Sequence, residues 1–347
     1  NIAIGYNAGD ALTSGNLNVF IGKDAGGKVN SGINNVYIGD GSGKEATTAA
    51  GNVAIGGQTM GYAGGSVLTG GDSVVIGYQA GRVMEGASDS NVFIGSGAGY
   101  RVTTSDKHVL IGAGAGAYIT TVDGTVAIGY GAGGALTSGQ FNLAIGYQAL
   151  NVHTTGGKNI AIGYHAMRDT DAGDNSLNSV GNVFIGYNAG SGDWADNDSN
   201  YNIGIGQSVL QDALNGVAGN IALGLSALQD LTGGNHNVSL GYQAGMAITT
   251  GDNNVLAARV AGTSLTTGDN NIMLGAYAGD AATTASGSIF LGIHAGGTLV
   301  TGNNNIGIGH TALGGAATTG DNNIAIGAYA GDALTSGNLN VFIGKDA

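Results

Sequence analysis

The chain has 347 residues, of which 70 are Gly and none is Pro or Cys, and its net charge is −13. The absence of Cys excludes a disulfide scaffold, a zinc–thiolate site and a thiol nucleophile. The negative charge disfavours nucleic acid and anionic membrane surfaces as partners, and the longest apolar runs fall far short of a membrane span.

A five-residue segment, first present as Asn-Ile-Ala-Ile-Gly at residues 1–5, recurs along the whole chain. Later copies begin at Asn18, Asn35, Asn52, Ser73, Asn91, His108, Thr125, Asn142, Asn159, Asn182, Asn202, Asn220, Asn237, Asn254, Asn271, Ser288, Asn305, Asn323 and Asn340. The spacing of these 20 copies is 17 residues in 13 of the 19 intervals. We number positions from the first residue of each copy. A fixed period of this size is typical of repeat proteins whose units stack on one another.

The first five positions of each copy predict a short strand followed by a corner. Position 2 is aliphatic in all 20 copies, and position 4 is Ile or Leu in all except the copy with Ala257. This alternation predicts a strand with one buried face, so that stacking would bury a continuous aliphatic column. Position 5 is Gly in 19 copies, which indicates a corner where φ is positive or backbones crowd.

The remainder of each copy is typical of a narrow coil closed by a turn. Position 8 is Ala in 17 copies, which implies an interior with little room. A segment of the type Thr-Thr-Gly-Asp-Asn ends many copies and supplies turn residues. The sequence therefore predicts an all-β fold, a parallel β-solenoid (β-roll) of about 20 coils with a 17-residue repeat. We expect residues 1–347 to form a single continuous solenoid without helices, because the 3.6-residue period is missing and Gly recurs too often.

The Asn column at position 1 is a candidate structural ladder. Asn occupies this position in 16 of 20 copies, and stacked Asn side chains can hydrogen-bond from coil to coil. A turn position that merely tolerates Asn is the alternative. Representative ladder residues are Asn1, Asn18, Asn35, Asn52, Asn142 and Asn159.

A second candidate column consists of Tyr at position 6. Tyr130, Tyr147 and Tyr164 follow one another in consecutive copies. Stacked rings could form a contact between chains or simply cover the surface of one chain.

The two longest copies of the middle region carry acidic insertions. The copy from Asn159 has 23 residues and the next, from Asn182, has 20. In a stacked solenoid their insertions, within residues 168–198, would emerge side by side with the only Trp. Six carboxylates, of Asp169, Asp171, Asp174, Asp193, Asp196 and Asp198, form a candidate Ca²⁺ site. The alternative is two solvated loops without a ligand, and no other cofactor is expected.

Thr pairs form a further column near the end of many copies, as at Thr103-Thr104, Thr249-Thr250 and Thr266-Thr267. Stacked Thr side chains resemble the ice-binding face of solenoid antifreeze proteins. Neighbouring residues of an extended chain point to opposite sides, so only one Thr of each pair could face water. A ladder with a role in the turn alone is the alternative.

The two ends of the chain are nearly identical. Residues 1–25 and 323–347 match at 23 of 25 positions, which sets a higher-order period of 322 residues over the shorter one. We expect the chain to be a window on a longer array; one local duplication is the alternative.

The segments Asn-Val-Ala-Ile-Gly at 52–56, Asn-Ile-Ala-Ile-Gly at 159–163 and Asn-Val-Phe-Ile-Gly at 182–186 resemble head repeats of YadA-like trimeric autotransporter adhesins. Similar repeats occur in phage tail fibres and other surface β-roll proteins. The resemblance implies a left-handed roll, association of three chains and a head that binds host matrix or other cells. The family repeat is shorter, near 14 residues, than the one found in this chain.

Together these features predict a structural protein rather than an enzyme. The expected function is that of a segment of an extracellular or cell-surface fibre or adhesin, or of a virion fibre, which associates with itself end to end or side by side. The alternative is a binding module for ice, carbohydrate, a host surface or calcium-dependent cell contact. That module would use the Thr ladder or the acidic loops at 168–198. Neither nucleic acid nor a membrane span is expected.

Overall fold

The structure is a computed structural model, which describes residues 1–62, 67–170, 178–194, 197–317 and 319–347. It confirms an all-β parallel β-solenoid with a repeat of about 17 residues, and no helix occurs among the described residues. The chain divides into two compact units, Asn1–Arg168 and Asp169–Ala347. The expectation of one continuous solenoid within a longer array extends beyond either unit and stays a prediction.

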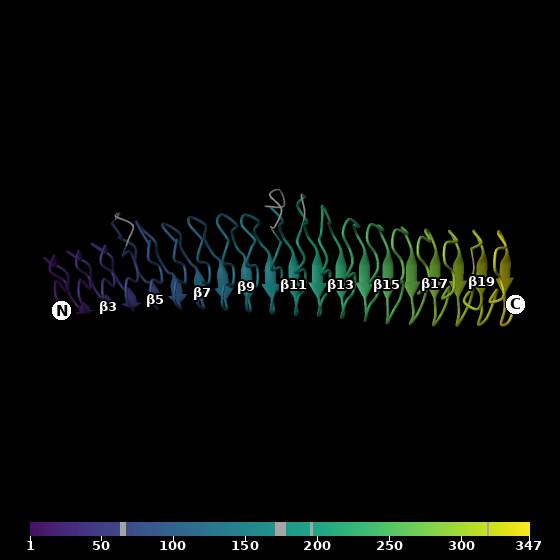
Figure 1. Cartoon of the computed structure of the whole chain (residues 1–347), viewed down its shortest axis with the longest axis horizontal. Coiled ribbons are helices and arrows are strands. Elements are labelled where there is room, and N and C mark those ends of the chain that lie inside the picture. Colours follow the sequence, from purple (N-terminus) through teal and green to yellow (C-terminus); the bar gives the residue numbers. More distant parts are fainter. Residues whose placement is uncertain (63–66, 171–177, 195–196, 318) are drawn as a thin grey trace. The chain divides into compact units, whose positions relative to one another are not determined.

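Among its described residues, each unit contains ten strands of three residues. Each strand occupies positions 2 to 4 of its repeat (Figure 1). The first unit holds β1 Ile2–Ile4, β2 Val19–Ile21, β3 Val36–Ile38, β4 Val53–Ile55, β5 Val74–Ile76, β6 Val92–Ile94, β7 Val109–Ile111, β8 Val126–Ile128, β9 Leu143–Ile145 and β10 Ile160–Ile162. The second unit holds β11 Val183–Ile185, β12 Ile203–Ile205, β13 Ile221–Leu223, β14 Val238–Leu240, β15 Val255–Ala257, β16 Ile272–Leu274, β17 Ile289–Leu291, β18 Ile306–Ile308, β19 Ile324–Ile326 and β20 Val341–Ile343.

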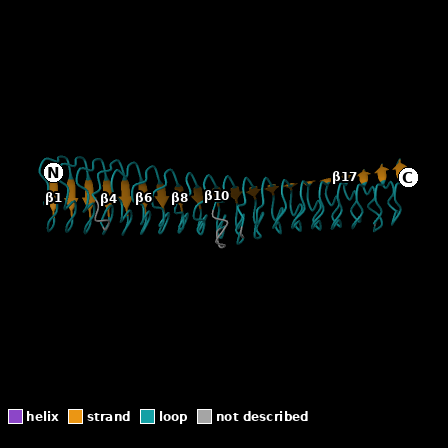
Figure 2. Ribbon diagram, turned by 90° about the horizontal axis from the view of Figure 1, so that it is seen from above, coloured by secondary structure: helices purple, strands orange, loops and turns teal. Residues whose placement is uncertain are grey.

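Consecutive strands within each unit pair in parallel and without a register shift. Ile2 is opposite Val19 in the first unit, and Val183 is opposite Ile203 in the second. Backbone hydrogen bonds join one coil to the next, as from Ile2 N to Asn18 O at 2.8 Å. Only one short strand contributes to each coil and the rest is turn and loop, as Figure 2 shows. Stability therefore depends on stacking, because a single coil buries almost nothing by itself.

The buried face of the strand is the opposite of the predicted one. Position 3 points inward in the interior coils, where Phe93 is completely buried, whereas Ile94 at position 4 is 36% exposed. The expected aliphatic interior column of positions 2 and 4 is therefore wrong. The reason is the period of two along a strand: the buried Asn at position 1 places position 3 on its own face and positions 2 and 4 on the other.

In most coils the interior is filled by a large residue at either position 3 or position 9, whereas coils such as those of Ala127, Ser239 and Ala325 have small residues at both positions. Phe93 at position 3 is accompanied by Gly99 at position 9, where an added Cβ would lie 2.8 Å from the ring. In another coil Ala144 stands at position 3 and the buried Leu150 at position 9. The same combination of a small residue at position 3 and a large one at position 9 occurs in the coils of Met60, Met167, Leu210, Leu228 and Leu313. Together with Ala at position 8, this exchange of volume between positions 3 and 9 keeps the narrow interior of those coils densely packed.

Position 5 is the corner that the sequence predicts. Gly146 has a φ of +136°, and a Cβ there would collide with the carbonyl group of Gly163 in the next coil. Ala258 is the one exception at this position and adopts a φ of 110°. The left-handed backbone also extends to residues that are not Gly, such as Gln148 at position 7 and Phe141 before the Asn column, which the sequence analysis missed.

Two buried His side chains replace other residues of the inner columns. His108 occupies the Asn column, where its Nδ1 accepts the Thr125 N–H at 3.2 Å and its Nε2 lies 3.1 Å from Ser105 Oγ. Burial lowers the pKa of His108. Burial also lowers the pKa of His153, at position 12, to about 4, against a smaller opposing effect of the Gly156 carbonyl. Both side chains are thus neutral at physiological pH.

Candidate functional site: the surface columns

The most extensive unusual surface is the outer side of the strands. We call the side chains at positions 2 and 4 of each strand the aliphatic face. Ile205 is 40% exposed, Leu240 38% and Ile272 37%, and most other members are half-buried. The exposure is partial because each side chain covers the side of its neighbour one coil away. The outer ends of the side chains remain open to solvent, so each unit presents an uncharged apolar stripe.

This stripe has a chemical consequence. Ten coils at about 4.8 Å and a stripe about 10 Å wide give about 480 Å² of apolar surface in each unit. Patches of about 300–600 Å² are the largest on ordinary monomers and are often functional. Such a face can bury itself only against another apolar surface, because it offers no hydrogen-bonding or charged group.

The predicted Asn column lies inside each coil. Asn18 donates its backbone N–H to Asn1 Oδ1 at 3.0 Å, and its Nδ2 donates to the same oxygen at 3.2 Å. The Nδ2 of Asn18 also donates to Gly32 O at 2.8 Å, which closes the turn of the coil. Corresponding bonds link Asn35 to Asn18, from its N at 3.0 Å and from its Nδ2 at 3.1 Å. Each Asn thus joins two coils and a turn.

The same ladder continues at the other named residues. Asn52 and Asn159 each donate a backbone N–H to the Asn one coil before, at 3.1 and 2.9 Å. Asn142 Nδ2 donates to Gly156 O at 2.9 Å. The series is interrupted before Asn142, where the buried Thr125 hydroxyl makes no hydrogen bond to any described residue. Asn18, Asn35, Asn52, Asn142 and Asn159 are buried and inaccessible to a ligand, whereas Asn1 in the first coil is exposed.

The Tyr column forms a stack on the surface of the first unit. The ring centroids of Tyr130 and Tyr147 are 5.3 Å apart, and those of Tyr147 and Tyr164 are 5.2 Å apart. The rings are tilted by only 12° and 9° from parallel. His165 extends the cluster, with its ring centroid 3.9 Å from that of Tyr164. All three Tyr rings stay exposed, so a contact between chains at this column stays a prediction.

In Thr pairs such as Thr249-Thr250 and Thr266-Thr267, the hydroxyl of the first residue is hydrogen-bonded to the backbone and the second residue is exposed to solvent. The first Thr of a pair donates to a carbonyl of the next coil, as from Thr249 Oγ1 to Thr266 O at 3.2 Å and from Thr266 Oγ1 to Thr283 O at 2.9 Å. The second Thr, as at Thr250 and Thr267, is exposed. Only one hydroxyl and methyl group in each coil can therefore meet a ligand.

The candidate calcium loops are only partly within the described residues. Asp171, Asp174 and Asp196 lie outside them, whereas Asp169, Asp193 and Asp198 lie within. The carboxylate of Asp198 accepts the Asn178 N–H at 3.2 Å. In the described part of the chain, no three His, Asp or Glu side chains are close enough together to hold a metal ion.

The expectation that Trp194 belongs to this loop surface is wrong. Its side chain is completely buried, and its ring stands at 64° to that of Phe184 with the centroids 5.8 Å apart. Trp194 is a core residue because the chain turns inward there and packs the indole on the inner face of β11.

Comparison of the sequence with known protein families and with curated proteins finds no match. The described residues include no helix that is long and apolar enough to cross a membrane.

Proposed function

We propose that the chain is a structural segment of an extracellular fibre or adhesin that associates side by side through the aliphatic face. The observation that carries this proposal is the exposed, uniformly aliphatic outer side of strands whose interiors are already filled. Hydrogen bonds of the Asn column and the sheet make each coil a template for the next, which suits a mechanical role.

A second copy of this chain is the partner that fits the aliphatic face best. The face repeats at every coil, so a partner that covers it along its length must present apolar groups at the same spacing. Another copy of the solenoid has the same spacing because it consists of the same coils. The resemblance to trimeric adhesin heads supports the same arrangement, with three chains around a common axis, and supports a place at a cell or virion surface.

The size of the face predicts how association depends on length. About 480 Å² in each ten-coil unit is below the roughly 800 Å² that each partner contributes to a standard stable interface. Each additional coil adds apolar area, so longer arrays should associate more tightly. The aliphatic face thus favours long fibres over short fragments.

Analytical ultracentrifugation of the purified chain tests this proposal. We expect an oligomer at micromolar concentration that dissociates in the double variant Ile94→Lys/Ile128→Lys, because two ammonium groups cannot be buried between apolar faces. The matched control is Thr104→Lys/Thr121→Lys, which places the same charges on the exposed Thr positions of the same unit. A wild-type chain that stays monomeric at 100 μM, or equal dissociation by both pairs, would contradict the proposal.

A binding module is the second candidate, and the exposed second Thr of each pair is the observation that favours it. Regularly spaced hydroxyl and methyl groups in consecutive coils could bind ice, and thermal hysteresis measures this directly. The calcium alternative predicts a calcium-dependent rise in melting temperature that is lost in Asp193→Ala/Asp198→Ala. Absence of both effects would remove these two forms of the module.

A further inference from the structure

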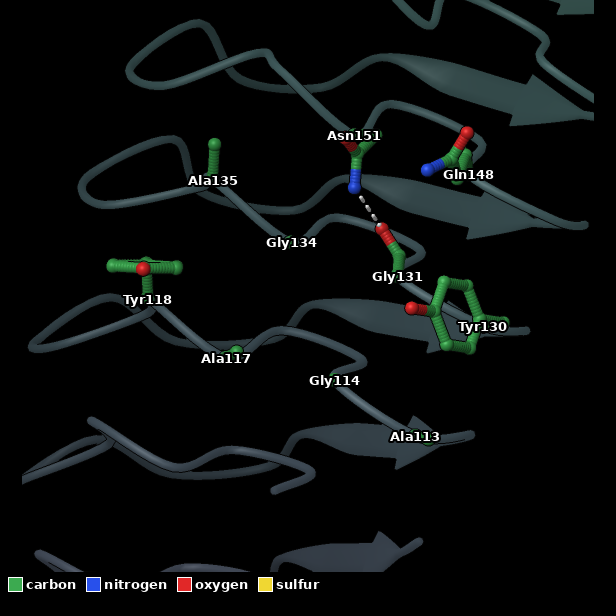
Figure 3. Close-up of a pocket in the computed structure, with 10 residues that line it drawn as sticks. All are labelled: Ala113, Gly114, Ala117, Tyr118, Tyr130, Gly131, Gly134, Ala135, Gln148 and Asn151. Carbon is green, nitrogen blue, oxygen red and sulfur yellow. Dashed lines mark hydrogen bonds between the residues drawn. The ribbon is translucent and has the colours of Figure 1, made fainter. Parts of the chain in front are cut away.

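The first unit contains a groove that none of the repeat columns predicts. It crosses three coils on the loop side, has a volume of about 440 Å³ and is shown in Figure 3. The volume falls in the range of small-molecule sites, about 300–1,000 Å³. Its floor consists of small residues, Gly114, Ala117, Gly131 and Gly134, which let a ligand approach the backbone.

The Tyr118 ring forms one wall. The guanidinium carbon of Arg101, one coil earlier, lies 4.6 Å from the centroid of this ring and covers one side of it. The corresponding residue one coil later is Ala135, which is too short to cover the other side (Figure 3). Tyr118 therefore presents one open aromatic face to the groove, and the side chain is 50% exposed.

The Tyr130 ring forms the opposite wall, and here the covered side of the ring faces the following coil and the open side faces the preceding coil. Tyr147, one coil later, stacks on one side of the ring at 5.3 Å. One coil earlier the column holds Ala113 instead of Tyr, so the second side of the ring is open. The short side chains of Ala135 in one column and Ala113 in the other thus leave one face of each Tyr ring open at the same groove.

Polar groups of the groove are amides rather than charges. Asn151 Nδ2 donates to Gly131 O at 2.7 Å, which fixes the Asn side chain at the edge (Figure 3). The amide of Gln148 also lines the groove, and it offers both a donor and an acceptor. The lining includes no ionisable group other than the two Tyr phenols.

We propose that this groove binds a neutral oligosaccharide, with a sugar ring against each open Tyr face and hydroxyl groups bonded to Gln148. The flat C–H face of a pyranose matches an aromatic ring, and its hydroxyls match an amide. The net charge of −13 argues against phosphate-bearing ligands such as nucleotides. A shallow site with two stacking contacts predicts dissociation constants of about 1 mM.

Saturation-transfer difference NMR tests the proposal. The probes are cello-, malto-, manno-, xylo- and chito-oligosaccharides of three to six units, each presented to the intact chain. We expect saturation transfer to ring C–H protons of at least one neutral series. Binding should weaken at least about tenfold in Tyr118→Ala and in Tyr130→Ala, which corresponds to about 1.4 kcal/mol or more.

Two further variants show whether weaker binding results from a changed groove or from a chain that fails to fold. Ala135→Tyr restores the missing ring over Tyr118 without removing a wall, so it should abolish binding in a folded chain. Tyr78→Ala removes an exposed Tyr of the same unit and the same position 6, away from the groove, and should leave binding unchanged. The proposal is overturned if no neutral probe binds at 10 mM or if Ala135→Tyr binds as the wild type does.

Discussion

Phe93 and Ile94 are neighbours in β6, yet they belong to an inner and an outer region of the molecule that differ in the residue types they contain. The inner region, at positions 1 and 3, is polar or variable in residue type, whereas the outer region, at positions 2 and 4, is almost uniformly aliphatic. Inside a coil, a change at position 3 can be offset by another residue of the same chain, as Gly99 offsets Phe93. The outer region has no such compensating residue within the chain, and its uniformity is the basis of the proposed side-by-side association. Apolar character by itself therefore does not identify the core of a solenoid.

The largest expected effect is at the inner region. Phe93→Ala should lower the free energy of unfolding by about 3–5 kcal/mol, because it leaves a cavity in a narrow interior. Adding Gly99→Leu should recover part of this loss, because Leu228 at the same position has the same left-handed backbone, with a φ of 48°. Urea unfolding of the single and double variants measures the coupling. If Gly99→Leu worsens the Phe93→Ala variant, the exchange of volume between positions 3 and 9 is refuted.

Substitution in the Asn column should lower the free energy of unfolding almost as much. Asn220 Oδ1 accepts the Asn237 N–H at 2.8 Å, and Asn220 Nδ2 donates to Gly234 O at 3.1 Å. Asn220→Ala leaves both buried partners unpaired and should cost about 3 kcal/mol.

Asn220→Ser is the matched variant for that position and should cost about half as much. The Oγ of Ser73 and of Ser288 accepts the backbone N–H of the following coil, at 3.1 and 3.2 Å. A Ser can therefore keep the acceptor function of the column while losing the bond to the turn. Equal midpoints of chemical unfolding for the Ala and Ser variants would show that the acceptor is unimportant.

The inner region should also be sensitive to acid. The pKa of His153 is about 4 in the folded chain and about 6.5 when unfolded, so the unfolded state binds more protons between these values. Stability should therefore fall as pH drops from about 6.5 to about 4, by about 3 kcal/mol for this group.

The variant His153→Leu isolates that contribution, because Leu136 occupies the same position one coil earlier. The difference in melting temperature between the variant and the wild type should widen steadily as the solution is acidified from pH 7 to pH 4.5. His108→Asn should act in the same direction, since burial lowers the pKa of that side chain too. A difference that stays constant with pH would rule out the acid sensitivity of these columns.

The smallest effect on stability is expected at the outer region. Ile94→Thr should change the unfolding free energy of the monomer by less than about 1 kcal/mol, because the side chain packs only at the rim of its column and Thr is well tolerated in strands. Urea unfolding should be measured at a concentration at which the wild type and Ile94→Thr are both monomeric. The loss of unfolding free energy in Phe93→Ala serves as the reference for a core residue. A loss as large as that of Phe93→Ala would place Ile94 in the core and remove the basis for the aliphatic face as an interface.

The repeat alone determined the solenoid, its period, the parallel register and the corner at position 5, because identical short segments can satisfy their backbone groups only by stacking on one another. The pairing of large and small residues at positions 3 and 9 was also present in the sequence, as Phe93 with Gly99 and Ala144 with Leu150 show. The side of each strand that faces inward is set by packing and hydrogen bonding between the stacked coils. Hydrophobicity favoured burial of positions 2 and 4, but the hydrogen bonds of the Asn column place position 1 inside the coil. Because alternate residues of a strand share one face, position 3 also points inward. The groove between Tyr118 and Tyr130 likewise required three dimensions, because it arises from residues that are small in one coil and aromatic in the next, and only stacking sets these side by side.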